Sequence, residues 1–197
     1  MEQVTVAPKA YVQLPELLSL MDEIPRSACA RMLFENHHHF VRASGSSHNH
    51  QAWLGGYVDH VTETMNVAVV LHDRLSAQRP LPFTLSDVLL VMFLHDLEKP
   101  WKGVWWLGRE ASKETRKSFR DGLIEKYLKL TPDQRNALRY VEGENEEYSS
   151  KERKMGPLAA LCHMCDIASA RLWPEHPLER DDPWVGASRS VKEGSSG

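Results

Sequence analysis

Residues 84–96 read TLSDVLLVMFLHD, a helix-capping signal followed by an apolar run and two polar side chains. Thr84 with Asp87 three positions later is typical of a helix N-terminus, because each side chain can accept the other's backbone amide. The apolar run predicts a buried helix. His95 and Asp96 close that helix, and an unpaired carboxylate in such a setting loses several kcal/mol of solvation. Asp96 therefore requires a partner or a cation.

Helical periodicity recurs along the rest of the chain, whereas alternating strand patterns are nearly absent. We therefore predict an all-α bundle of about seven helices. A single domain is expected over residues 1–172, which is long enough to bury a core. Residues 173–197 are rich in proline and are expected to form a flexible tail.

Composition narrows the classes of partner. The formal net charge of -3 and the pI near 6.4 provide no basic field for stable nucleic-acid binding, so small ligands are favoured. Three cysteines are an odd number and too few for a disulfide framework, which favours a reducing compartment. The longest apolar stretch, near residues 88–94, is too short to cross a bilayer. We expect a cytoplasmic protein without a membrane partner, and a homo-oligomer is compatible with the sequence.

Four polar residues in otherwise apolar helical segments are expected to form one metal site. His60 precedes His95 and Asp96 along the chain, and Asp166 is the only acid between residues 155 and 170. Two imidazoles and two carboxylates make a mixed nitrogen and oxygen set that suits Mn²⁺, Fe²⁺, Co²⁺, Ni²⁺ or Zn²⁺. The C-terminal carbonyls of the helix before His95 add partial negative charge, which also favours a cation.

These motifs, in this order, resemble those of the HD-domain superfamily of metal-dependent phosphohydrolases. The matching stretches are GGYVDHVTE at 55–63, FLHDLEK at 93–99 and CHMCD at 162–166. The resemblance implies an HD-type helical bundle in which His60, His95, Asp96 and Asp166 bind one divalent ion. The absence of histidine from residues 97 to 162 favours a mononuclear centre. A second ion, Mg²⁺ or Co²⁺, could enter with the substrate.

The resemblance also implies catalytic roles. A bound ion polarises phosphorus-bound oxygens and lowers the pKa of a coordinated water. Asp96 or Glu98 would orient or deprotonate that water, and Lys99 would contact phosphate oxygens, with Arg116 and Arg120 as weaker candidates for that contact. The loop before the first histidine offers His50, Trp53, Gly55 and Gly56 as substrate contacts. Hydrogen-bond donors, an aromatic ring for stacking and a glycine backbone that a ligand can approach closely would suit binding of a nucleobase. The same features equally suit a loop that packs against the protein.

The expected activity is hydrolysis of a nucleotide phosphate ester or anhydride. Compact members of the family resemble deoxynucleoside triphosphate triphosphohydrolases of the dATP-cleaving type and 5'-nucleotidases. One alternative is a 3'-to-5' exonuclease, because some HD exonucleases carry Gly-Gly before the first histidine. Such an enzyme needs a basic groove along the nucleic-acid backbone, which the composition disfavours. The other alternative is a catalytically silent nucleotide-binding HD module.

Three further clusters of polar residues occur in the sequence, and none of them is expected to bind a metal. A second His-Asp pair, His72-Asp73, lies near the polar end of its helix beside Arg74 and is expected to form a surface ion pair. Successive side chains of the run His37–His39 point in different directions on a helix, so no metal role is assigned to it. The acidic segment 142–147 is expected to be a solvated turn.

Overall fold

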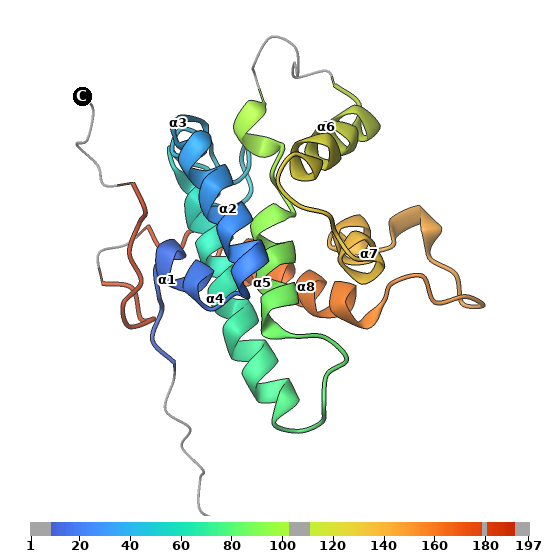
Figure 1. Cartoon of the computed structure of the whole chain (residues 1–197). Helices are drawn as coiled ribbons and strands as arrows, with labels where there is room; N and C mark the ends of the chain where they lie inside the picture. The colour runs from blue at the N-terminus through green and yellow to red at the C-terminus, as the bar shows by residue number, and fades with distance from the viewer. Residues whose placement is uncertain (1–8, 103–110, 179–180, 192–197) are drawn as a thin grey trace, which may run out of the picture.

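The computed structural model describes residues 9–102, 111–178 and 181–191, and these ranges contain helices and no strand (Figure 1). The prediction of an all-α bundle is confirmed. The described ranges contain eight α-helices, against about seven expected. They are α1 (Leu14–Ser19), α2 (Glu23–Glu35), α3 (His37–Phe40), α4 (Gly56–Ser76), α5 (Leu85–Leu94), α6 (Lys113–Glu125), α7 (Pro132–Tyr140) and α8 (Pro157–Ile167). A π-helical turn, Ala168–Leu172, continues α8.

Helices α4 and α5 form the centre of the bundle, and α8 packs against both (Figure 1). Helix α1 contacts α4, α2 contacts α5, and α7 contacts both α5 and α8. Every residue of α5 from Val88 to Leu94 is at most 1% exposed, as expected for a helix that is apolar on all sides. This burial places the residue after α5, His95, in the interior of the domain.

The predicted cap of α5 is present. Thr84 Oγ1 accepts a hydrogen bond from the Asp87 amide at 3.1 Å, and Asp87 Oδ2 accepts one from the Thr84 amide at 2.9 Å. Asp87 is tied further into the bundle, because its Oδ1 accepts a hydrogen bond from Gln134 of α7 at 2.8 Å. The start of α5, and hence the position of its C-terminal end, is fixed by these contacts.

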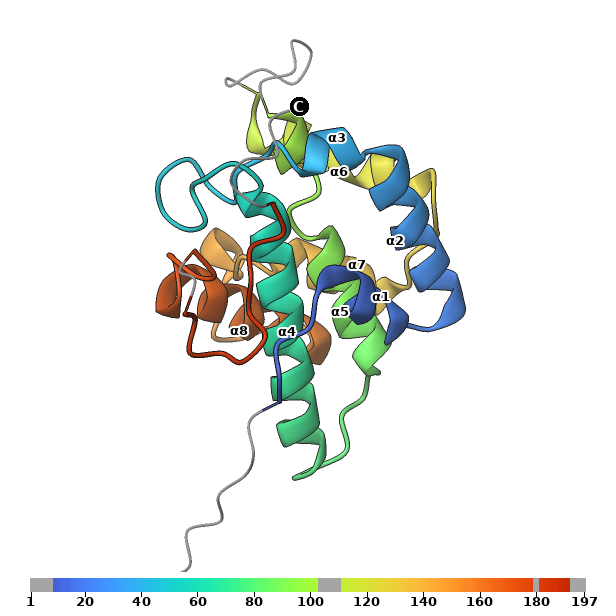
Figure 2. The same ribbon diagram turned by 90° about the vertical axis from the view of Figure 1, so that its left-hand side faces the viewer.

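The C-terminal segment, for which a flexible tail was predicted over 173–197, makes packing contacts with the helices in its described part. Figure 2 shows its described part running along α4. The Trp184 ring lies edge-on to Tyr11 at 5.3 Å, and the Ser190 amide donates to Asp59 of α4 at 2.6 Å. Prolines prevent a helix here, but the aromatic rings still anchor the segment. Residues 179–180 and 192–197 lie outside the described ranges.

The length and hydropathy of the helices also bear on membrane association. Among the described residues, no helix combines the length and the apolar character that crossing a bilayer requires. The longest is α4, with 21 residues, and its central part packs inside the bundle, where it carries His60 and Glu63.

Candidate metal centre

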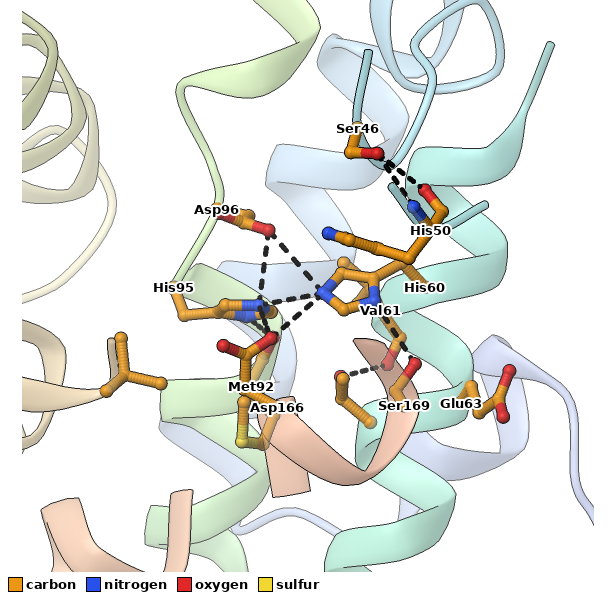
Figure 3. A network of polar contacts seen from close by, with 12 residues as sticks. Ser46, His50, His60, Val61, Glu63, Met92, His95, Asp96, Asp166 and Ser169 are labelled. Atoms are coloured by element: carbon orange, nitrogen blue, oxygen red, sulfur yellow. Dashed lines mark hydrogen bonds and ion pairs between the residues drawn. The ribbon is translucent and has the colours of Figure 1, made fainter. Parts of the chain in front are cut away.

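Side chains from α4, α8 and the end of α5 converge on one point (Figure 3). His60 Nε2 lies 3.2 Å from His95 Nε2, and Asp166 Oδ1 lies 3.3 Å and 3.6 Å from these two nitrogens. The donor atoms of His60, His95 and Asp166 all lie within 4.8 Å of one another, so this buried group could hold a metal ion. Asp96 is outside that group of three, but its Oδ2 lies 3.5 Å from His60 Nε2 and 3.3 Å from His95 Nε2.

These separations fit donors that share one ion. With metal–ligand bonds of about 2.1 Å, neighbouring donor atoms lie about 3.0 Å apart at right angles and about 3.4 Å apart at tetrahedral angles. The observed separations between the imidazole nitrogens and the carboxylate oxygens are 3.3 to 3.6 Å. His60, His95 and Asp166 are therefore close enough to share a cation without a change of backbone, and Asp96 Oδ2 faces the same two imidazoles.

Hydrogen bonds on the outer side of each imidazole direct its inner nitrogen to the centre. His95 Nδ1 lies 2.7 Å from the Met92 carbonyl, which can only accept, so Nδ1 carries the proton. His60 Nδ1 lies 3.2 Å from Ser169 Oγ. Both Nε2 atoms then face the centre, the arrangement in which ligating histidines are commonly held. Ser169 was not predicted, and its only sequence signal is its position three residues after Asp166.

Burial and charge set the protonation of the site. Burial lowers the pKa of His60 to about 4, so this imidazole is neutral near pH 7. Burial also opposes the charge on His95, but Asp96 and Asp166 outweigh it and raise the pKa of His95 to about 10. Burial opposes ionisation of Asp166 too, but hydrogen bonds from His60 and His95 hold its pKa below the ordinary range. Two ionised carboxylates are thus balanced within the chain by His95 and Lys99, and a bound cation would have to replace the proton on His95.

The two residues predicted for proton transfer and phosphate contact adjoin this group. Lys99 Nζ forms an ion pair with Asp96 Oδ2, the same oxygen that faces both imidazoles. Glu98 is half-buried, and its Oε2 has no hydrogen-bond partner. Burial, together with the charge of Asp96, raises the pKa of Glu98. Glu98 can therefore carry a proton at a pH where an ordinary glutamate has lost it.

A basic cavity of about 220 Å³ opens beside the group. Seven cationic side chains line it, together with His95, Glu98, Leu138 and Glu142: Lys99, Lys102, Lys113, Arg116, Lys117, Arg120 and Arg139. Four of the seven come from one face of α6, at the spacing i, i+3, i+4, i+7. The guanidinium of Arg120 donates to the His95 carbonyl at 3.3 Å, so this wall is attached directly to the predicted ligands. Sequence reasoning favoured Lys99 as a phosphate contact over Arg116 and Arg120, because the cations of α6 become its neighbours only through folding.

Of the substrate contacts predicted in the loop before His60, His50 is the one that reaches the centre. Its ring lies 4.5 Å from the His60 ring, and it extends from the loop toward Asp96 (Figure 3). His50 Nδ1 lies 2.8 Å from Gln51 Oε1, which fixes the ring orientation. Burial, together with the charge of Lys99, lowers the pKa of His50. A neutral imidazole therefore borders the site.

Trp53 has a packing role instead. Its Nε1 donates to Asp59 Oδ2 at 2.8 Å, and the Arg189 guanidinium lies over its ring at 5.6 Å. Asp59 precedes His60 on α4, so their side chains diverge by about 100° around the helix. These contacts hold Trp53 between α4 and the C-terminal segment, and its role as a substrate contact stays a prediction.

Gly55 and Gly56 are likewise covered by the chain, rather than open to a ligand. A Cβ on Gly56 would lie 1.9 Å from the Gln51 carbonyl oxygen, and one on Gly55 would lie 2.5 Å from Val191 Cγ2. Gly55 also has a φ of 80°, in the left-handed region that favours glycine. The alternative of a packed loop explains both glycines.

We predict that Gly56→Ala lowers the free energy of unfolding by about 3 kcal/mol, because the added methyl group must displace backbone. Gly122→Ala is the matched control. Nothing lies within 4 Å of a Cβ there, and an exposed helical site gains about 0.5 to 1 kcal/mol from alanine. Urea unfolding followed by circular dichroism measures both variants. Equal stability of the Gly56 variant and the wild type would contradict the packing explanation.

The remaining polar clusters make local contacts. Asp73 Oδ1 pairs with Lys9 Nζ at 3.2 Å, in agreement with the ion pair expected there, although the partner is Lys9 more than Arg74, which lies at 3.9 Å. In the acidic segment, Glu142 pairs with Lys113 at 2.8 Å and Glu144 accepts the Met155 amide at 2.7 Å. The acidic turn is therefore tied to α6 and to the start of α8.

Comparisons of the chain with protein-family models, curated protein sequences and solved structures find no match. The fold and the site thus define an all-α domain with a buried group, His60, His95 and Asp166, that could hold a metal ion.

Proposed function

We propose that this protein is an HD-type phosphohydrolase that uses a divalent transition metal to cleave nucleotides, most favourably deoxynucleoside triphosphates. One observation carries the proposal: a His/Asp group suited to a cation borders a cavity lined by seven cationic side chains. Few classes of ligand suit both features. A phosphate group coordinates divalent metals through oxygen and is attracted by lysine and arginine.

The roles of the residues follow from their positions. His60, His95, Asp96 and Asp166 would hold the ion, with Mn²⁺, Fe²⁺, Co²⁺, Ni²⁺ and Zn²⁺ as candidates. Such an ion, when bound, supplies polarisation of phosphate oxygens and a water of lowered pKa. Glu98, with its raised pKa, is placed to donate or accept a proton beside the group.

The other residues suit substrate binding. Lys99 faces both the group and the basic cavity, so it can contact a phosphate oxygen at the reacting end. His50 borders the group from the opposite loop, and because its Nδ1 proton is directed to Gln51 Oε1, its Nε2 can accept a hydrogen bond from the nucleotide. A second ion, Mg²⁺ or Co²⁺, would enter with the phosphates of the substrate.

The basic cavity supports a triphosphate over the alternatives. Several cations suit a chain of phosphates better than a single one. Lys102, Arg116 and Lys117 line the cavity beside four cations that also contact carboxylates of the chain, namely Lys99, Lys113, Arg120 and Arg139. Hydrolysis of a monophosphate by a 5'-nucleotidase is the next candidate activity, because a monophosphate could bind to the same ion. An exonuclease requires cations distributed along a strand, whereas these line one cavity. A silent nucleotide-binding module would use the same cavity without turnover.

The experiment is a metal and substrate series. Protein stripped with a chelator is reloaded separately with Mn²⁺, Fe²⁺, Co²⁺, Ni²⁺, Zn²⁺ and Mg²⁺, and incubated with deoxynucleoside triphosphates, monophosphates and an oligonucleotide. Chromatography should find nucleoside and inorganic triphosphate with at least one transition metal. Orthophosphate from monophosphates alone would indicate a nucleotidase. Salt-sensitive digestion of the oligonucleotide would indicate an exonuclease, and nucleotide binding without hydrolysis under every metal would refute the enzyme proposal.

A further inference from the structure

A second cavity, of about 620 Å³, lies between α4, the residues before α1 and the C-terminal segment. Its walls are largely apolar, and none of its lining residues belongs to the group that could hold a metal. Trp173, Trp184 and Tyr11 contribute the large aromatic surfaces, and Glu63 of α4 contributes a carboxyl group. The proposed phosphohydrolase activity makes no use of this space.

The aromatic rings form a corner. Tyr11 and Trp184 have centroids 5.3 Å apart with an angle of 85° between their planes, and Trp173 and Trp184 are 5.7 Å apart at 63°. A flat ligand needs parallel faces on either side, which these angles do not offer. A rounded ammonium group can contact several steeply inclined faces at once, and each face attracts a cation through its quadrupole.

Glu63 supplies a carboxyl group without a cationic partner. It is 2% exposed, it forms no ion pair with any described residue, and Gln51 Nε2 is 3.5 Å from its Oε2. The Tyr11 hydroxyl, which also lies in this wall, is buried and has no hydrogen-bond partner. Burial, with the charges of Asp182 and Asp59, raises the pKa of Glu63 to about 9. Near pH 7 this carboxyl therefore keeps its proton until a cation pairs with it.

The other charged groups of the cavity are already paired. Lys9 and Arg74 lie 3.2 Å and 3.9 Å from carboxylate oxygens of Asp73. Asp182 accepts a hydrogen bond from the Trp184 amide at 2.7 Å, and its second oxygen lies 2.8 Å from the ring nitrogen of His176. A positively charged ligand would therefore meet Glu63 as the carboxyl group of the lining that lacks such contacts, and Glu63 would release its proton on pairing with the ligand.

We propose that this cavity binds a small organic cation with an alkylated ammonium group, which contacts the faces of Tyr11, Trp173 and Trp184 and pairs with Glu63. The chemistry of the ligand is set by the ring angles and the buried carboxyl group together. Either feature alone would be compatible with an ordinary apolar pocket. The site is independent of the proposed hydrolysis, because it shares no lining residue with the basic cavity.

The test uses choline and its uncharged carbon analogue, 3,3-dimethyl-1-butanol, with no nucleotide and no added metal. Isothermal titration calorimetry and tryptophan fluorescence should both report choline binding, with affinity at least about ten-fold above that of the alcohol. Equal affinity for the two compounds would show that the cavity binds only apolar groups, and this result would overturn the proposal. Absence of binding by choline, tetramethylammonium and spermidine would overturn it as well.

Variants separate the carboxyl group from the rings. Glu63→Gln keeps the size of a neutral side chain and should weaken choline binding about ten-fold while leaving the alcohol unaffected. Trp184→Leu should weaken choline binding, and a melting curve checks that each variant is folded. Glu175→Gln, an exposed glutamate outside the cavity lining, is the control and should bind choline as the wild type does. Undiminished choline affinity in Glu63→Gln would refute the assignment of the counter-charge.

Discussion

Asp166→Ala is expected to lose the bound metal and to hydrolyse nucleotide about 1,000-fold more slowly than the wild type. Asp166 Oδ1 faces both imidazoles, at 3.3 Å and 3.6 Å, so its removal leaves the ion without a carboxylate from α8. A metal ion contributes several kcal/mol of charge stabilisation to such reactions, and about 4 kcal/mol corresponds to a thousand-fold in rate. Mass spectrometry of the purified protein measures the metal, and release of inorganic triphosphate measures the rate.

His60→Ala should have the same two effects, because its Nε2 completes the group from α4. His72→Ala is the control. It removes a histidine of the same helix that precedes the ion-paired Asp73, and it should leave both metal content and rate near the wild-type values. Circular dichroism establishes that the variants are folded. Wild-type metal content in Asp166→Ala would disprove the assignment of the ligands, whatever the rate.

The double variant Arg116→Ala, Lys117→Ala should raise the KM for a deoxynucleoside triphosphate about 100-fold at unchanged metal content. Both side chains are half-buried in the wall of the basic cavity. A hydrogen bond to a charged group contributes about 1.5 to 3 kcal/mol, so two lost contacts account for an effect of this size. The KM for a monophosphate should rise much less, because a single phosphate beside the ion depends mainly on Lys99.

Steady-state kinetics with both substrates measures this difference. Arg135→Ala is the matched control, since Arg135 is an exposed cation of α7 that does not line the cavity. It changes the net charge of the protein by one unit and should leave both KM values near those of the wild type. An unchanged KM for the triphosphate in the double variant would show that the basic cavity does not bind the substrate.

The sequence predicted the parts of the structure that depend on local pattern. The cap at Thr84 and the apolar run of α5 follow from hydrogen bonding and periodicity within a few residues, and both are confirmed. The convergence of His60, His95 and Asp166 was predictable because each is a polar residue that an apolar helix cannot leave unpaired. The solvation cost of a buried polar residue depends on that residue and its neighbours in the sequence, so it can be predicted from the sequence alone.

Features that arise from contacts distant in the chain were not predicted. Gly56 looks like a point of ligand approach in the sequence, but the Gln51 carbonyl fills that space. Trp184 lies in a segment that composition marks as a tail, but its ring packs on Tyr11 from the opposite end of the chain. The basic cavity likewise requires α6 and α7 to be placed beside Lys99. In each case the residue that makes the contact is distant in the chain, and no local sequence pattern identifies it.

The chain is synthesised from its N-terminus, and this order determines when the group that could hold a metal is complete. His60, His95 and Asp96 belong to the first half of the sequence, whereas Asp166 and the Ser169 hydroxyl come near its end. A nascent chain that has emerged only as far as α7 therefore lacks the α8 carboxylate and the hydrogen bond that orients His60. Capture of the proposed ion would have to await α8, which would make metallation a late step in the maturation of this protein.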